Sequence, residues 1–257
     1  MSNIKMPAIM SDISVSVVSH GQATLTSLLL ADLQSQCLDV DIILTRNIPE
    51  STSMGHARLS RVKYIDNSSP KGFGANHNTA FRYCDSPFYC VANPDIRIES
   101  NPFPVLRAAM NDPKVGLVVP LVLNPTGGVE DSIRYFPTPL GVIGKALGLS
   151  EGRFPVETVR PTAVDWAAGM FMFFRAEAFA DVGGFDEKYF LYYEDVDICA
   201  RLWKAGWKVM LQPVVSVVHA AQRTSRKNPR YLVWHLSSMA RYFAKHLGRL
   251  PRDVSGS

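Results

Sequence analysis

Short runs of β-branched and apolar residues alternate with helical patterns through the first half of the chain. A helical repeat of leucines spans residues 23–34, and a second helical pattern begins after the loop GFGANHN. The strand-like runs are ISVSVVS (13–19), VDIILT (40–45), RVKYID (61–66), FYCVANPD (88–95) and VGLVVPLVL (115–123). This alternation predicts an α/β fold with a Rossmann-like, mostly parallel sheet and helices on both faces.

Several of the predicted strands end in polar residues, with the sequences SHGQ, TRN and NPD. In a parallel sheet the carboxyl ends of the strands meet at one edge, and ligands bind outside that edge. We therefore expect the functional side chains at these strand ends.

Composition narrows the class of protein. The chain has 257 residues, of which 47% are hydrophobic and 19% charged, so it is long enough for one sizeable globular domain. Its four cysteines form no CxxC pair, which is typical of reduced, cytosolic thiols. The start MSNIKMPAIMSD lacks a signal-peptide layout, and no apolar run reaches the ~18 residues that span a bilayer. We therefore expect a cytoplasmic protein that meets a membrane only from its surface.

Basic residues gather near the C-terminus. Residues 223–252 hold eight Lys or Arg and no acid, whereas the rest of the chain holds 19 basic and 23 acidic residues. This asymmetry predicts a polyanionic partner, either a membrane or a nucleic acid. Without a recognised reader motif, nucleic acid is the less favoured of the two. We divide the chain into a body (1–222) and a basic amphipathic arm (223–257).

A helical pattern within the basic arm leaves two interpretations open. Arg241 and Lys245 lie opposite an apolar stripe, as expected of an interfacial helix on anionic lipid. The same pattern fits a helix that packs on the body with solvated charges. The stripe consists of Leu232, Leu236, Met239, Phe243 and Leu247.

A different segment, 124–162, is rich in Gly and Pro and is predicted to be a flexible loop on the acceptor side.

Three acids lie close together in the stretch YYEDVDICARLWKAG, which predicts a helix from about Glu194 to just before Gly206. Asp197 and Arg201 have the spacing of a salt bridge. Asp195 points roughly opposite to Asp197 and has no evident helical partner. It fits either a general base or a helix-dipole acid in the first turn, and the local pattern alone favours the latter.

Two further residues fit a metal site. Asp95 follows a buried strand in NPDIRIE, where a carboxylate is a suitable ligand for a divalent cation, although Asn-Pro-Asp is also ordinary turn chemistry. His219 follows the apolar run VVSVV and by itself is more typical of a core histidine. If the two lie together, one carboxylate and one imidazole share a metal such as Mn²⁺.

The loop GFGANHN (72–78) is a weak glycine-rich signal. It lacks the spacing of a dinucleotide fingerprint or a Walker loop. Its glycines fit the close approach of a flat ligand, and Asn76 and Asn78 fit contacts to a base or ribose. A plain tight turn explains the same residues.

Taken in order, six blocks resemble a family 2 glycosyltransferase with a GT-A fold. They are VSVVSHGQ, GFGANHN, NPD, DWAAGMFMFFR, GGFDEKYFLYYEDVDICARLWKAG and VVHAAQRTSRK. Together with SIRYFPT (132–138) and VWHLSSMARYFAKH, they are most similar to bacterial O-antigen rhamnosyltransferases. The resemblance implies inverting transfer of L-rhamnose from dTDP-L-rhamnose to N-acetylglucosamine on a diphosphate-polyprenol lipid, at the cytoplasmic face of the membrane.

The resemblance also implies roles for individual residues. Asp195 matches the catalytic base, which reverses the preference from local pattern. Asp95 and His219 match ligands of a divalent metal, Mg²⁺ or Mn²⁺. The residues that we expect to contact the nucleotide are His20, Asn47, Gly74, Asn78 and Asn93. The residues that we expect to form the acceptor or sugar wall are Trp166, Tyr192, Tyr193 and Glu194.

Two residues depart from the family pattern. Asn93 stands where many members have the first Asp of a DxD motif, and His20 stands where many have Asn. An uncharged Asn93 lowers the expected metal affinity. Three functions therefore remain open. They are the rhamnosyltransferase, the same fold with another nucleotide sugar or acceptor, and a non-catalytic sugar-nucleotide-binding domain. Intact Asp95, Asp195 and His219 oppose the last.

Overall fold

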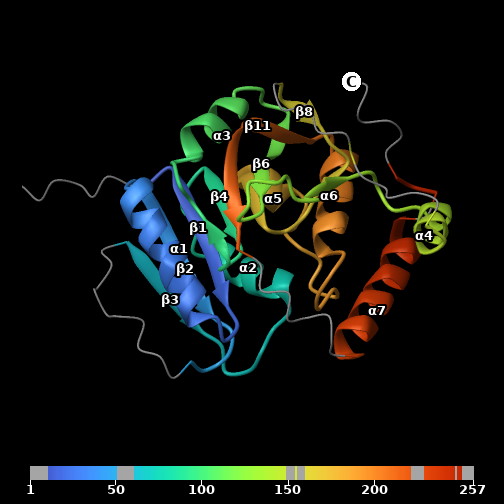
Figure 1. The fold of residues 1–257 in the computed structure, drawn as a ribbon, viewed down its shortest axis with the longest axis horizontal. Coiled ribbons are helices and arrows are strands. Elements are labelled where there is room, and N and C mark those ends of the chain that lie inside the picture. The colour runs from blue at the N-terminus through green and yellow to red at the C-terminus, as the bar shows by residue number, and fades with distance from the viewer. Residues whose placement is uncertain are drawn as a thin grey trace, which may run out of the picture.

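The computed structural model describes residues 11–50, 61–148, 154, 160–220, 229–246 and 248–250. Within these ranges the chain forms a nine-stranded sheet in the order β3-β2-β1-β4-β10-β6-β11-β5, with β8 paired beside β11 (Figure 1). The strands are β1 (Ile13–Ser19), β2 (Val40–Arg46), β3 (Val62–Asp66), β4 (Phe88–Ala92), β5 (Ile96–Arg97), β6 (Val115–Leu123), β8 (Thr162–Ala163), β10 (Phe171–Arg175) and β11 (Lys208–His219).

The sheet is mostly parallel, which confirms the prediction. Parallel pairs join β1 to β2 and β4, β2 to β3, and β6 to β11. The exception is β10, which lies antiparallel between β4 and β6, while β5 and β8 add antiparallel pairs to β11. All five predicted runs contain strands. The fourth ends at Ala92 because a turn follows, in which the Ile96 amide donates to the Asn93 carbonyl at 3.2 Å.

Helices cover both faces of the sheet (Figure 1). Residues of α1 and α3 belong to one hydrophobic core, and residues of α5, α6 and α7 belong to a second. Along β4, Cys90 and Ala92 enter the first core while Tyr89 and Val91 enter the second, as the two-residue period of a strand requires. The helices are α1 (Ala23–Gln36), α2 (Phe73–Phe81), α3 (Phe103–Ala109), α4 (Pro139–Ala146), α5 (Ala176–Asp181), α6 (Glu194–Lys204) and α7 (Pro229–His246).

The segment 124–162, predicted to be a loop, is not uniformly irregular. It contains the helix α4 and the strand β7 (Ile133–Arg134), which pairs with β9 (Trp166–Ala167). The prediction was therefore wrong for these residues. Thr138 caps α4 by accepting a hydrogen bond from the Gly141 amide, and Pro139 occupies the first turn. Residues 149–153 and 155–159 lie outside the described part, and the role of the segment on the acceptor side stays a prediction.

The C-terminal helix α7 docks on the body through a buried carboxylate of α6. Asp197 has no exposed side-chain surface and lies 2.7 Å from Arg201 Nε, 2.7 Å from Lys245 Nζ and 2.7 Å from His246 Nε2. The predicted Asp197–Arg201 pair is thus confirmed. Burial by itself would raise the pKa of Asp197, but these partners outweigh it and hold the pKa well below its usual value.

One face of α7 therefore packs on the body, as the second of the two interpretations of this helix expected. Tyr242 and His246 are buried against the body, and Lys245 also pairs with Asp186 at 2.8 Å. The expectation of a solvated Lys245 was therefore wrong. Leu232 and Leu236 of the predicted apolar stripe are instead exposed. Residues 221–228 and 251–257 of the arm lie outside the described part. Among the helices that the structure does describe, none is long and apolar enough to cross a bilayer.

The Asp197 network predicts a measurable cost when its charge is removed. Asp197→Asn leaves two cationic side chains and His246 around an uncharged amide, so we expect unfolding to require about 3–5 kcal/mol less than in the wild type. Because the pKa of Asp197 is depressed, the stabilisation is complete above the unfolded-state pKa of about 4 and is lost as pH falls through the folded-state value. Urea unfolding at neutral pH and at decreasing acidic pH measures the difference.

The matched control is Asp112→Asn, which removes an exposed carboxylate paired with Lys208. Exposed pairs contribute about 0–1 kcal/mol, so this variant should stay close to the wild type. Equal stabilities of the Asp197 and Asp112 variants would contradict the role assigned to the buried network.

Candidate active site

The polar residues predicted at the strand ends do gather at one edge of the sheet. His20 follows β1, Asn47 follows β2, Asn93 follows β4 and His219 ends β11. Since these four strands run in the same direction, their carboxyl ends place the side chains on the same side of the molecule.

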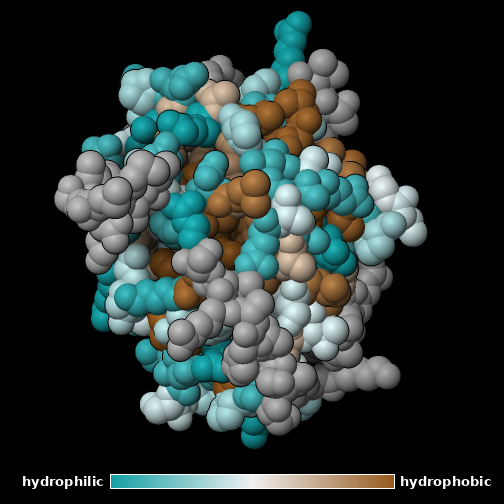
Figure 2. Space-filling model, turned by 90° about the vertical axis from the view of Figure 1, so that its left-hand side faces the viewer, coloured by the Kyte–Doolittle hydropathy of each residue, from teal (hydrophilic) through white to brown (hydrophobic). Residues whose placement is uncertain are grey.

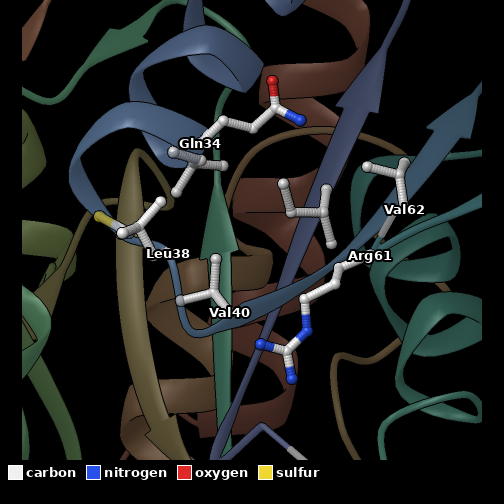
Figure 3. A pocket seen from close by; sticks show the side chains of 8 residues that line it. Gln34, Leu38, Val40, Arg61 and Val62 are labelled. Atoms are coloured by element: carbon white, nitrogen blue, oxygen red, sulfur yellow. The ribbon is translucent and has the colours of Figure 1, made fainter. Parts of the chain in front are cut away.

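The small cavity drawn in Figure 3 lies at the opposite edge. It has a volume of about 160 Å³ and lies between the end of α1, marked by Gln34 and Leu38, and the first residues of β2 and β3, Val40 and Val62. The thiol at its side, Cys37, is unreactive because burial raises its pKa to about 12. This cavity carries no catalytic constellation.

Asp95 and His219 meet, as the metal-site hypothesis requires. The pairing of β5 with β11 sets His219 opposite Ile96, and the Ala220 amide donates to the Asp95 carbonyl at 2.8 Å. As a result, Asp95 Oδ2 lies 3.3 Å from His219 Nε2. The other carboxylate oxygen, Asp95 Oδ1, is buried and has no hydrogen-bond partner within the described part of the chain. An orphaned carboxylate oxygen beside an imidazole nitrogen is a donor set that fits a divalent cation.

Glu130 is a member of this cluster that the sequence did not reveal. Its Oε2 lies 2.8 Å from His219 Nδ1, on the far side of the ring from Asp95. The hydrogen bond fixes the orientation of the imidazole, so that Nε2 faces Asp95. A bridge between Leu123 and Val129 turns Glu130 inward from a Gly-Gly turn, a position that no local pattern marks.

The two carboxylates and the ring do not converge on one point. Glu130 and Asp95 hold opposite nitrogens of His219, and no group of three or more acidic, histidine or cysteine side chains among the described residues is arranged to hold a metal. Burial by itself would lower the pKa of His219, and the two carboxylates outweigh this and raise it.

Asp195 lies in the first turn of α6 and is held by backbone amides. The Gly169 amide donates to its Oδ2 at 3.1 Å and the Val196 amide to its Oδ1 at 2.8 Å. Burial raises the pKa of Asp195, although these amides and the charge of Arg134 oppose the shift. Asp195 is thus an oriented carboxylate with no cation bonded to it among the described residues, unlike Asp197 two positions later.

One short segment connects the two halves of the site. The Gly169 amide binds Asp195, and the carbonyl of the next residue, Met170, accepts a hydrogen bond of 2.9 Å from the Asn93 amide. Gly169 packs closely on Phe73, whose ring would lie 3.0 Å from any added Cβ. The distance between Asp195 and the turn that carries Asp95 is therefore fixed by consecutive peptide groups.

The predicted wall is built by aromatic side chains on strained backbone. Tyr192 and Tyr193 have φ values of +69° and +66°, a left-handed conformation that costs about 1–3 kcal/mol at each non-glycine residue. His235 of α7 contacts both rings with centroid distances of 5.4 Å. Trp166 is fixed by a 2.9 Å hydrogen bond from its indole to the Tyr135 carbonyl.

Glu194 corrects the expected wall. Its side chain is only 5% exposed, so it lies behind the aromatic residues and does not form part of an open surface. Among the described residues its Oε2 has no hydrogen-bond partner. Burial, followed by the charge of Asp195, raises the pKa of Glu194 well above its usual value.

On the side of β1 and β2, His20 and Asn47 lie together. Asn47 Nδ2 is 3.0 Å from His20 Nδ1, and Asn47 also bonds both the carbonyl and the amide of Lys71 and the side chain of Asn67. Asn47 is 4% exposed, whereas His20 is exposed. Asn47 therefore holds the shape of this corner, and His20 presents its ring to the open side.

Gly74 and Asn78 have packing roles, and their predicted contact with a nucleotide stays a prediction. A Cβ on Gly74 would lie 2.6 Å from Phe185 Cβ, so the glycine lets α2 approach the core. Asn78 donates to the Phe185 carbonyl at 2.8 Å and to Glu187, and accepts from the Phe185 amide at 2.9 Å. These bonds to the loop before α6 engage both the nitrogen and the oxygen of the Asn78 side-chain amide.

Arg134 is a second residue that the prediction missed. It pairs with Asp131. Burial raises the pKa values of both Asp195 and Tyr193, and the charge of Arg134 opposes the rise. Its strand β7 pairs with β9, which brings Arg134 opposite Trp166. In the sequence, the block SIRYFPT that contains Arg134 supported only the family resemblance and gave Arg134 no role.

Comparisons with known proteins agree with this arrangement. The family described as "Glycosyltransferase like family 2" matches residues 45–242. Rhamnosyltransferase WbbL of Escherichia coli K12 is 29% identical over 245 residues, which cover 89% of this chain and 91% of that protein. The N-acetylglucosaminyl-diphospho-decaprenol L-rhamnosyltransferase of Mycobacterium tuberculosis H37Rv is 36% identical over 170 residues. That match covers 62% of this chain and only 55% of the mycobacterial protein.

Solved structures share the fold. GalNAc-T7 with UDP, GalNAc and Mn²⁺ superposes with a TM-score of 0.64 at 17% identity, covering 84% of this chain and 44% of that one. The mannosyltransferase PcManGT of Pyrobaculum calidifontis with GDP-Man and Mn²⁺ gives 0.62 at 17% identity, covering 95% and 67%. The chain therefore belongs to glycosyltransferase family 2 and is a glycosyltransferase with a GT-A fold.

Proposed function

We propose that this glycosyltransferase moves L-rhamnose from dTDP-L-rhamnose, with inversion, to N-acetylglucosamine on a diphosphate-polyprenol lipid at the cytoplasmic face of the membrane. The observation that carries the proposal is the two-centre site, in which one segment joins the base Asp195 to the turn of Asp95. The similarity to the rhamnosyltransferases of Escherichia coli and Mycobacterium tuberculosis supports the choice of sugar and acceptor.

Asp195 has the properties of a general base for this reaction. Two backbone amides orient its carboxylate, and burial raises its pKa toward the operating range. Burial and the charge of Asp195 raise the pKa of the adjacent Glu194 well above its usual value, which opposes ionisation of Glu194 beside an ionised Asp195. Asp195 accepts the proton of the acceptor hydroxyl as that oxygen attacks the anomeric carbon, and the nucleoside diphosphate leaves from the opposite face.

Asp95 Oδ1 and His219 Nε2 are the protein atoms that would hold a divalent cation. Such a cation, when bound, neutralises the charge that develops on the departing diphosphate. Glu130 keeps the ring of His219 turned toward Asp95. Asn93 would add no charge to such a site, so Asp95 would supply its negative charge. Mn²⁺ in the solved structures of two fold neighbours supports this assignment.

The uncharged Asn93 favours one alternative, a domain that binds a sugar nucleotide without turnover. The backbone of Asn93 is nonetheless tied to Met170 at 2.9 Å, next to the amide that orients Asp195. Asn93 thus keeps a structural link between the two centres that does not depend on the charge of its side chain. This link, with the intact Asp195, supports the enzyme over the binding domain.

Replacing the proposed base, Asp195, tests the mechanism. Asp195→Asn keeps the acceptors for the Gly169 and Val196 amides but cannot take a proton, so we expect a normal fold, normal nucleotide binding and a transfer rate lower by about 10²–10⁴. Single-turnover transfer from radiolabelled dTDP-L-rhamnose measures it, with Asp112→Asn as the surface control. Near-normal turnover of the Asp195 variant would reject its role.

Thermal stability in the presence of nucleotides and metal ions tests the proposed donor and cation. Among dTDP, UDP, GDP and CDP, we expect dTDP with Mn²⁺ or Mg²⁺ to raise the melting temperature most, because a ligand at one hundred times its Kd stabilises the folded state by about 2.7 kcal/mol. Asp95→Asn should remove the metal-dependent part of the shift and keep the nucleotide-only part, whereas Asp112→Asn should keep both. A larger shift with UDP or GDP would refute the rhamnose assignment and leave the fold intact. Failure of every nucleotide would favour the non-catalytic domain.

A further inference from the structure

The outer faces of α7 and α4 are apolar where a water-exposed helix would be polar. On α7, Leu232 is 61%, Val233 63% and Leu236 49% exposed. On α4 and at its end, Leu140 is 81%, Ile143 55% and Leu147 67% exposed. These six residues are called the outer apolar surface below.

The outer apolar surface does not face the protein core. In α7 the buried side chains are Ser238, Tyr242 and His246, which repeat every four residues and define the docked face. Leu232, Val233 and Leu236 lie around the other side of that helix. In α4 the exposed residues Leu140, Ile143 and Leu147 follow the spacing of one helical face. Both helices are thus amphipathic, with an apolar side left in contact with solvent.

The two helices lie side by side. Burial, followed by the charge of Lys145 at the end of α4, lowers the pKa of His235 in α7, so the two side chains are near one another. Figure 1 shows α4 and α7 together at one end of the molecule, away from α1 and β3. The apolar faces of both helices therefore contribute to the same end.

The charges on these helices have one sign. Neither 139–148 nor 229–246 contains an Asp or Glu, while Lys145 and Arg241 are exposed. The face on the side of α1 and β3 has a different character, with hydrophilic and hydrophobic residues interspersed (Figure 2). An apolar surface with only cationic charges complements an anionic lipid bilayer.

The outer apolar surface also adjoins the acceptor side of the site. The ring of Trp234 in α7 packs against that of Phe190 in a tilted arrangement with a centroid distance of 4.7 Å, and His235 contacts Tyr192 and Tyr193. Four residues separate α4 from β7, whose Arg134 acts on the pKa of Asp195. A sugar at Asp195 that is joined to a lipid would therefore direct its chain toward this end of the molecule.

We propose that the outer apolar surface of α4 and α7 inserts shallowly into an anionic lipid bilayer and holds the site at the level of the lipid-linked acceptor. The proposal rests on the proposed function only for the identity of that acceptor. It differs from the sequence-based expectation of a basic arm, because Lys245 and His246 are turned into the body and the contact is made by leucines, isoleucine and valine from two separate helices.

The experiment is co-sedimentation of the full chain with vesicles of phosphatidylcholine, with and without phosphatidylglycerol. Two double variants place acids in the surface, Leu232→Glu with Leu236→Glu and Leu140→Glu with Ile143→Glu. The matched control is Leu38→Glu, which changes a leucine that is 74% exposed beyond the end of α1. We expect the wild type and the control to bind anionic vesicles, and each double variant to bind about tenfold more weakly. Lys145→Gln with Arg241→Gln should reduce the preference for phosphatidylglycerol.

Unchanged vesicle binding of both double variants, with melting temperatures equal to the wild type, would overturn the proposal. A wild type that ignores vesicles but dimerises, with monomeric double variants, would also overturn it and identify the surface as a contact between two copies of the chain. Transfer to a water-soluble N-acetylglucosamine diphosphate acceptor distinguishes failure of the membrane surface from failure of the proposed function. Double variants that lose vesicle binding but keep normal transfer to this soluble acceptor support both the membrane surface and the proposed function. Absence of transfer in every protein, with vesicle binding lost only in the double variants, refutes the function and supports the surface.

Discussion

The peptide groups of Gly169 and Met170 are the interaction on which the geometry of the site depends. One orients Asp195 through its amide, and the next holds the Asn93 turn through its carbonyl. They precede β10, the antiparallel strand between β4 and β6, which brings a chain segment back to the edge where the parallel strands end. Proton acceptance and diphosphate binding need opposite faces of one sugar. A rigid backbone link fixes that separation better than two independent loops would.

Helix α6 gives two aspartates opposite electrostatic environments within one turn. Asp197 faces inward, where Arg201, Lys245 and His246 hold its pKa low. Asp195 faces the site, where backbone amides orient it and burial raises its pKa. The rotation of about 100° per residue separates the structural carboxylate Asp197 from the proposed base Asp195. Lys245 and His246 belong to α7. Helix α6, which bears Asp195, therefore also anchors, through Asp197, the helix that contributes to the proposed membrane contact.

Sequence patterns predicted the strands of the parallel sheet and the helix of the acidic cluster, while the family resemblance implied that Asp95 and His219 meet. The sequence did not show roles that depend on a distant partner. Gly74 and Asn78 stay predicted nucleotide contacts, but Phe185, more than a hundred residues later, gives both a packing role that the sequence did not indicate. Glu130 lies in a turn without any motif and reaches His219 through a single bridge between Leu123 and Val129. In α7 the predicted apolar stripe does not form one docked face, because Leu232 and Leu236 are exposed while Phe243 packs against the core, and Leu247 lies outside the described part. Which face docks depends on Asp197 in another helix.

The sequence by itself determined the class of fold, because the periods of strands and helices are local, and the family, because several motifs occur in a fixed order. The family resemblance also gave the candidate groups, Asp195 as the proposed base and Asp95 with His219 as proposed metal ligands. Only the tertiary structure decided which carboxylates are buried, which are held by backbone amides and which pair with cations, because desolvation and charge partners come from residues far apart in the chain. For the same reason, only the folded molecule distinguishes the apolar face of α7 that binds the body from the one that remains exposed.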